Sequence, residues 1–125
     1  MTPHAAADFL VTLAEPTRLR ILNCVAAAPL FVSDLVAILA LPQPTVSRHL
    51  RVLRELGVVQ DTAISPYVVY RLDPQAPHGR LVRAILDALR DAPHSRAERV
   101  SAQRISRAEA SVRLVDAPSD MPNAP

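Results

Sequence analysis

The chain has 125 residues, of which 50% are hydrophobic and only 3% aromatic, so Leu, Val, Ile and Ala must build one modest core. All fourteen basic residues are Arg and the formal net charge is +2, a balance that permits nucleic acid as a partner. A single cysteine, Cys24, excludes an intramolecular disulfide and any site built from several thiolates of one chain. No apolar run is long enough to cross a bilayer and no signal segment opens the chain, so we expect a cytoplasmic protein without a membrane partner.

Helical spacing of apolar residues predicts four helices in the first half of the chain. The first is expected over His4–Ala14, and the second begins at Pro16, where a missing N–H costs nothing. Ser33 is the predicted N-cap of a short third helix. The corner "ALPQP" then turns the chain into a fourth helix, with Pro44 in its first turn and Gly57 as its C-cap.

The fourth helix is amphipathic. Val46, Leu50 and Leu53 face one way, toward the expected core, and the opposite face carries polar and cationic groups. His49 stands at the border of the two faces, where we expect a packed, hydrogen-bonded histidine.

In the second half of the chain the spacing of apolar residues changes from helical spacing to alternation. The stretch "VVQDTAISPYVVYRL" alternates in the manner of a β-hairpin, with Ser65 and Pro66 near its turn. A fifth helix over Gly79–Asp91 has an apolar face wider than a lone surface helix needs, which predicts a partner subunit. Residues 1–92 are therefore expected to form one domain, followed over 93–125 by a sixth helix past Pro93 and a disordered Pro-rich tail.

The order of these elements is typical of a winged helix-turn-helix, and from roughly Phe9 to Leu89 the chain resembles the ArsR/SmtB bacterial repressors. Four stretches carry the resemblance: "LAEPTRLRIL", "VSDL", "PQPTVSRHLRVLRELGVV" and "VVYRL". It implies a mainly α fold with a β-hairpin wing and a homodimeric repressor that is not an enzyme. The two fourth helices would enter successive major grooves of a near-palindromic double-stranded DNA operator.

The resemblance also predicts which residues contact DNA. They are on the fourth helix: Gln43, Pro44, Thr45, Ser47, Arg48 and Arg51. Arg48 and Arg51 can donate to base edges and phosphates, and Thr45 can meet the backbone or a thymine methyl. A merely solvated charged face is the alternative, which we disfavour because a short helix and a sharp corner precede this helix.

The usual metal switches of the family are not expected here. Some members hold metal through two cysteines in an "LCVCDL" stretch, whereas this chain has "LFVSDL", with Phe31 and Ser33 in those places. Another branch binds zinc on the fifth helix, where only His78 fits and the companion positions lack ligand atoms: Ala76, Leu89 and Ala92. We therefore predict no metal site and no cofactor.

Four further residues are candidates for sensing an inducer, and none of them identifies it. Cys24 is a candidate redox sensor, but its place on the apolar face of the second helix favours a buried small hydrophobe. His4, His78 and His94 have no partner at helical spacing and are expected at the surface. The inducer is thus unknown, and a repressor that senses through Cys24 or a small molecule is one alternative.

The predicted wing departs from the family pattern. It carries Asp61 and has no Arg before Arg71, so we expect it to contribute little phosphate binding. A winged-helix module used only to bind protein is therefore the second alternative.

Overall fold

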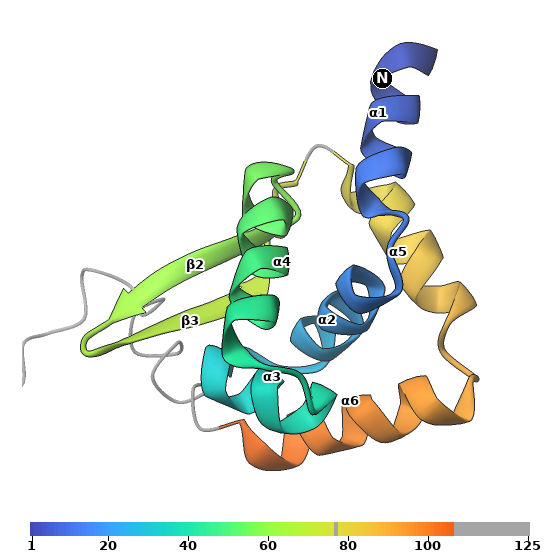
Figure 1. Cartoon of the computed structure of the whole chain (residues 1–125). Coiled ribbons are helices and arrows are strands. Elements are labelled where there is room, and N and C mark those ends of the chain that lie inside the picture. Colours follow the sequence, from blue (N-terminus) through green and yellow to red (C-terminus); the bar gives the residue numbers. More distant parts are fainter. Residues whose placement is uncertain (77, 107–125) are drawn as a thin grey trace, which may run out of the picture.

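The computed structural model describes residues 1–76 and 78–106 (Figure 1). Within them the helices and strands follow in this order: α1 Pro3–Leu13, α2 Pro16–Ala27, β1 Leu30–Phe31, α3 Val32–Leu39, α4 Gln43–Glu55, β2 Val59–Ile64, β3 Tyr67–Leu72, α5 Gly79–Ala88 and α6 Pro93–Ile105. The mainly helical class and the hairpin predicted from the sequence are confirmed. The expected Pro-rich tail falls on residues 116–125 and lies outside the described part.

Proline and side-chain caps set the first two helices. The Thr2 hydroxyl accepts a hydrogen bond from Ala5 N, and the Glu15 carboxylate accepts one from Arg18 N at 2.9 Å. In both helices a proline follows the capping residue, where its fixed φ fits the first turn. α2 begins at Pro16 as predicted.

The start of α3 corrects one prediction. Ser33 is not the N-cap, because α3 already begins at Val32 and Phe31 takes the capping position, two residues before the predicted one. Instead, the buried carboxylate of Asp34 accepts a hydrogen bond from Phe31 N at 3.0 Å and so fixes the chain entering the helix from the N3 position. α5 also differs, because it ends at Ala88 rather than at Asp91.

The sheet has three antiparallel strands in the order β1-β3-β2. β2 and β3 form the predicted hairpin, with Thr62 opposite Val69 in the register. The two-residue strand β1, which the sequence did not predict, pairs Leu30 with Tyr70. It joins the chain between α2 and α3 directly to the middle of β3.

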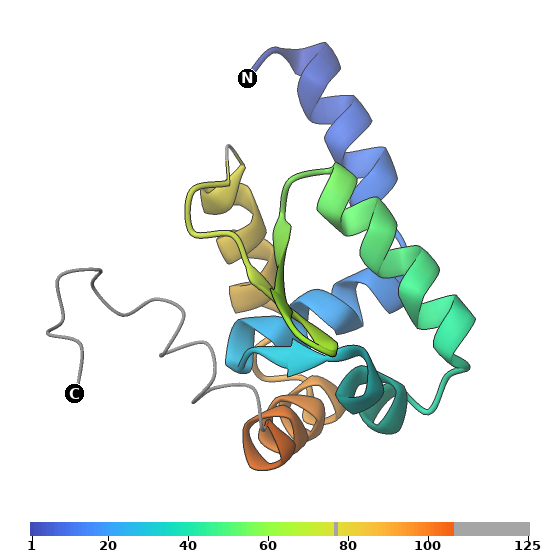
Figure 2. The ribbon, with the colours of Figure 1, turned by 90° about the vertical axis from the view of Figure 1, so that its left-hand side faces the viewer.

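The core lies where α2, α3, α4 and the base of the sheet meet, with α6 across α2 and α3 on one side (Figure 1). Leu22, Leu35 and Leu50 are among its fully buried side chains, and Ala102 brings α6 into close contact. Turned by 90°, the molecule has α1 protruding at the end opposite α6 (Figure 2). No helix among the described residues is both long and apolar enough to span a bilayer.

Candidate nucleic-acid interface

A tight corner orients α4 relative to α3. α3 ends at Ala40, which adopts the left-handed conformation with φ of 55°, and only Leu41 and Pro42 separate it from the first residue of α4. Such a conformation in a residue with a Cβ persists only where the surrounding packing holds it. The two helices therefore form a helix-turn-helix unit of fixed geometry.

The far end of α4 is fixed by a Schellman motif. Val58 N donates to Leu53 O at 3.2 Å and Gly57 N donates to Arg54 O at 3.0 Å. Gly57 has φ of 84°, which a residue without a Cβ adopts at little cost. The chain thereby leaves α4 and enters β2 at once, so the hairpin lies beside α4.

Burial along α4 agrees with the predicted wheel. Val46, Leu50 and Leu53 are fully buried and hold the helix to the core. Of the six residues predicted to contact DNA, four are exposed and two, Thr45 and Ser47, are half-buried; the exposed ones are Gln43, Pro44, Arg48 and Arg51. The Gln43 amide donates to the Ser47 hydroxyl at 3.0 Å, so these side chains lie together on the first turns.

Arg48 and Arg51 are exposed guanidinium groups that form no ion pair or hydrogen bond with the described residues. Two other arginines near α4 are engaged. Arg54 pairs with Asp61 of β2 at 3.2 Å, and Arg18 of α2 donates to His49 Nδ1 at 3.2 Å. Arg48 and Arg51 therefore keep their donors available for an external anion.

His49 lies against α2, where the Glu15 carboxylate is also 3.8 Å from His49 Nδ1. Its packed, hydrogen-bonded state was predicted and is confirmed, and it joins α4 to the start of α2.

The wing presents an apolar tip. Tyr67 is 60% exposed and Val68 37% exposed, while Phe31 from β1 packs against the Tyr67 ring at 5.3 Å between centroids. The Asp61 carboxylate, which we expected to weaken phosphate binding, is compensated by Arg54.

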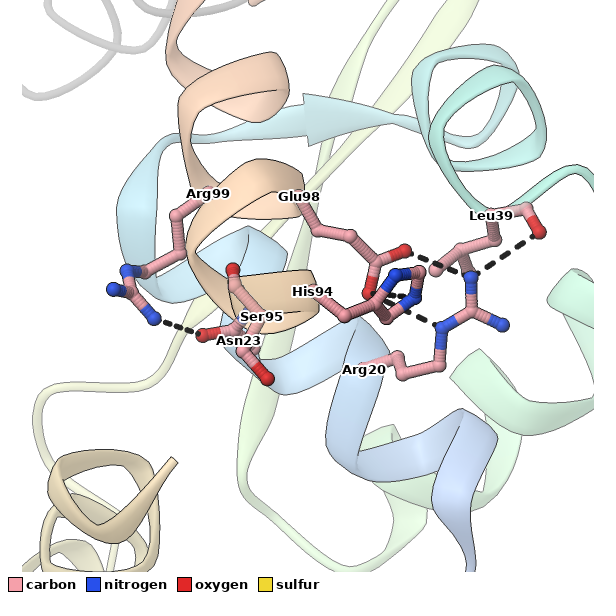
Figure 3. Close-up of polar contacts among 7 residues, drawn as sticks. All are labelled: Arg20, Asn23, Leu39, His94, Ser95, Glu98 and Arg99. Atoms are coloured by element: carbon pink, nitrogen blue, oxygen red, sulfur yellow. Dashed lines mark hydrogen bonds and ion pairs between the residues drawn. The ribbon is translucent and has the colours of Figure 1, made fainter. Parts of the chain in front are cut away.

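Behind the helix-turn-helix lies a polar cluster that sequence reasoning missed (Figure 3). The Arg20 guanidinium donates to Glu98 Oε2 at 2.8 Å and Oε1 at 3.1 Å, and also to Leu39 O at 3.3 Å. Glu98 is 4% exposed, and its hydrogen bond to Arg20 raises the pKa of that guanidinium above its ordinary value. Arg20 thus joins α6 to the last turn of α3, just before the corner.

Asn23 extends this cluster along α6. Its amide donates to Ser95 O at 2.9 Å and accepts from Arg99 at 3.1 Å (Figure 3). Glu98 and Asn23 lie far apart in sequence from the groups they meet, so only their burial in the folded chain could identify them.

The candidate sensor residues are dispersed. Cys24 is fully buried, and desolvation raises the pKa of its thiol to about 12. His4 is exposed, and the exposed His94 lies 3.5 Å from Glu98 Oε1. His78 was expected at the surface but is half-buried, because its ring packs against Phe9 of α1 at 4.2 Å between centroids with the planes tilted by 60°. Over residues 1–76 and 78–106, no three His, Cys, Asp or Glu side chains gather in a way that could hold a metal ion.

Comparison with known proteins points to one family. A family model described as "Bacterial regulatory protein, arsR family" matches residues 15–61, which include α2, α3 and α4. The arsenic resistance transcriptional regulator ArsR1 of Pseudomonas putida is 41% identical over 79 residues, covering 61% of this chain and 62% of that protein. The biofilm growth-associated repressor of Xylella fastidiosa is 34% identical over 82 residues, covering 66% of this chain and 71% of the relative.

The fold has solved counterparts. The crystal structure of the transcriptional repressor BigR from Xylella fastidiosa superposes with a TM-score of 0.61 at 32% identity, covering 66% of this chain and 81% of that one. The match to ArsR1 leaves more than a third of that protein's length unmatched.

Proposed function

Because the chain belongs to the ArsR family of bacterial regulatory proteins, we propose that it is a cytoplasmic transcriptional repressor that binds double-stranded DNA as a homodimer through α4. The observation that carries the proposal is the pair of exposed arginines, Arg48 and Arg51, on the outward face of the second helix of a helix-turn-helix. A helix fits the major groove, and a guanidinium can meet guanine or phosphate in two hydrogen bonds.

The corner and the caps support this role, because recognition requires a rigid helix. Val46 and Leu50 hold the inner face of α4, and the Arg20 contact to Leu39 O steadies the end of α3. The proposed DNA contacts are made by Gln43, Pro44, Thr45, Ser47, Arg48 and Arg51. The hydrogen bond between Gln43 and Ser47 holds two of these side chains together on the first turns of α4.

Exposed apolar groups on α1 and a half-covered face on α5 support the dimer. Leu10 is 44% exposed and Val11 77% exposed on α1, while Leu81 and Ile85 of α5 are only half-buried. The start of α5 lies near α1 (Figure 1), and Phe9 of α1 contacts His78 just before α5. A second copy packed there would cover these side chains and place two α4 helices on one side of a duplex.

A protein-binding winged helix is the second candidate, favoured by the apolar tip of the wing at Tyr67 and Val68. Such a module would not release counterions from a duplex. Membership in a family of regulatory proteins supports the expectation that the chain is not an enzyme. We further propose that it lacks the family's metal switches, because Phe31 and Ser33 stand at the thiolate positions.

The test begins with the DNA that the protein retains from its own genome, which is sequenced to define an operator. Affinity for that duplex is then measured by fluorescence anisotropy at two salt concentrations for the wild type, Arg48→Ala and Arg51→Ala. Each substitution should cost about 1–3 kcal/mol if the residue contacts a base, or reduce the salt slope by about one if it contacts phosphate.

Arg80→Ala is the matched control, because it removes the same charge from the exposed face of α5. Wild-type affinity in the folded Arg48 and Arg51 variants would remove α4 from the interface. A wild type without salt-dependent DNA binding would favour the protein-binding alternative.

A further inference from the structure

A cavity of about 280 Å³ lies between the base of the hairpin and α5. Its apolar walls include Val58 and Leu72 on the hairpin side and Val82 and Leu86 on α5. This volume is close to the lower end of the range for small-molecule pockets, about 300 Å³, so it suits only a small ligand. Val82 is buried and belongs to the same hydrophobic core as Val58, so the cavity lies beside a packed contact of α5.

The charged groups at the cavity favour an anion. Arg71 and Arg83 both line it, opposed by one carboxylate, Asp73. The Asp73 carboxylate accepts a hydrogen bond from Gln75 N at 2.9 Å and so serves the turn of the connecting loop. Arg71 has a partner within the chain, whereas Arg83 is exposed and forms no ion pair or hydrogen bond with the described residues. A carboxylate could therefore meet Arg83 without breaking an existing contact.

The first turn of α5 leaves room beside these groups. Gly79 lines the cavity, and a Cβ added at Gly79 would meet no heavy atom within 4 Å. The space is therefore not filled by a neighbouring side chain at this end of the cavity.

We propose that this cavity binds a small organic carboxylate, with its apolar body between Leu72 and Val82 and its anionic group at Arg83. A ligand with both parts fits better than a neutral apolar one, because the latter would leave the guanidinium without its ion. It also fits better than inorganic phosphate, because phosphate has no group to cover the apolar walls.

If the chain has the proposed function, the position of the cavity gives such a ligand a regulatory effect. Gly79, Val82, Arg83 and Leu86 share one face of α5 by their i, i+3, i+4, i+7 spacing. Exposed Ala84 and Ala88 lie on another side of the helix, available to a second copy. A ligand in the cavity thus contacts the hairpin through Leu72 and the proposed dimer helix α5 through Val82. By shifting the hairpin relative to α5, it changes DNA affinity.

The binding test uses phenylacetate as the probe and phenylacetamide as its uncharged control, with the full chain and no DNA. Two-dimensional amide NMR should give saturable shifts at Leu72, Gly79 and Val82 with phenylacetate, and about fivefold weaker binding of phenylacetamide. Arg83→Gln should weaken phenylacetate about fivefold, and Arg80→Gln, which removes a charge on α5 outside the cavity, should not. Equal affinity for the two probes, shifts scattered over the arginine-bearing surface, or no shift at about 20 mM would overturn the site.

A second arm adds phenylacetate or phenylacetamide to the protein–operator complex at matched ionic strength. Phenylacetate alone should change the apparent Kd about threefold or more, and Arg83→Gln should abolish that difference. Saturable binding in the cavity with unchanged DNA affinity would overturn the proposed regulatory effect of the ligand. If the wild type binds no DNA, the proposed function fails while the first arm still decides the site.

Discussion

Removing the Glu98 carboxylate should destabilise the fold by an amount that its burial sets. The Glu98 side chain is 5% exposed and accepts two hydrogen bonds from Arg20, whose side chain is 30% exposed. Loss of one partner from a fully buried ion pair costs about 3–5 kcal/mol. Because Arg20 can regain part of its hydration, we expect Glu98→Ala to lower the free energy of unfolding by about 2–3 kcal/mol.

A surface pair in the same chain provides the control. Arg54 and Asp61 are 3.2 Å apart, with side chains 48% and 36% exposed, so Asp61→Ala should cost about 1 kcal/mol or less. Both variants are measured by urea denaturation followed by circular dichroism, at one fixed protein concentration. Glu98→Ala also removes the partner that fixes the Arg20 guanidinium, which donates to Leu39 O at the end of α3. Operator affinity should therefore fall in this variant.

A double-mutant cycle between Arg20→Ala and Glu98→Ala separates the pair from the packing of either side chain. The two costs should be strongly non-additive, because the second substitution removes a charge that the first has already left without its partner. A Glu98→Ala cost no greater than that of Asp61→Ala, or Arg20 and Glu98 effects that simply add, would refute a buried ion pair between α2 and α6.

Three other outcomes are expected. Leu10→Glu combined with Val11→Glu should give a folded monomer by sedimentation, because both side chains are exposed in one subunit; a persistent dimer would place the interface elsewhere. Cys24 should resist iodoacetamide at pH 8 until denaturant is added, because a pKa of about 12 leaves about one thiol in ten thousand ionised; rapid native labelling, read by mass spectrometry, would contradict its burial. Zinc, cadmium and arsenite at micromolar concentration should not release the operator in an anisotropy titration, and stoichiometric release retained in Cys24→Ser would reveal a metal site.

Elements with a long apolar period could be predicted from the sequence. α4 was recognised because Val46, Leu50 and Leu53 repeat at helical spacing and Gly57 marks its end. The hairpin was recognised from its alternation and its Ser-Pro turn. These signals are local, so they can be recognised without knowledge of the tertiary structure.

What the sequence missed depends on distant partners or on very short segments. β1 has two residues, too few to show a period, and it exists only because β3 offers a free edge. Ser33 is a good cap by propensity, but Asp34 reaches back to Phe31 N and moves the start of the helix. Glu98 meets its partner Arg20 across a sequence separation of 78 residues, and no local pattern indicates that Glu98 is buried.

The predicted DNA contacts remain a prediction, although their surroundings are now defined. The sequence placed Arg48 and Arg51 on the outward face, and the structure adds that neither is engaged by the described residues. The sequence could not indicate that Arg54 pairs with Asp61, because that pair forms only when the hairpin folds back along α4.

The pairing of β1 with β3 constrains the order in which the chain can fold during its synthesis on the ribosome. Leu30 meets Tyr70, so the strand edge before α3 waits for forty more residues to be synthesised. At about 5–20 residues per second this takes about 2–8 s. During that time α3 and α4 are synthesised while Leu30 still lacks its partner strand, and Arg20 must wait longer still for Glu98. The emerging chain therefore completes the core around its helix-turn-helix late, and its apolar residues are open to chaperones until α6 has left the ribosome.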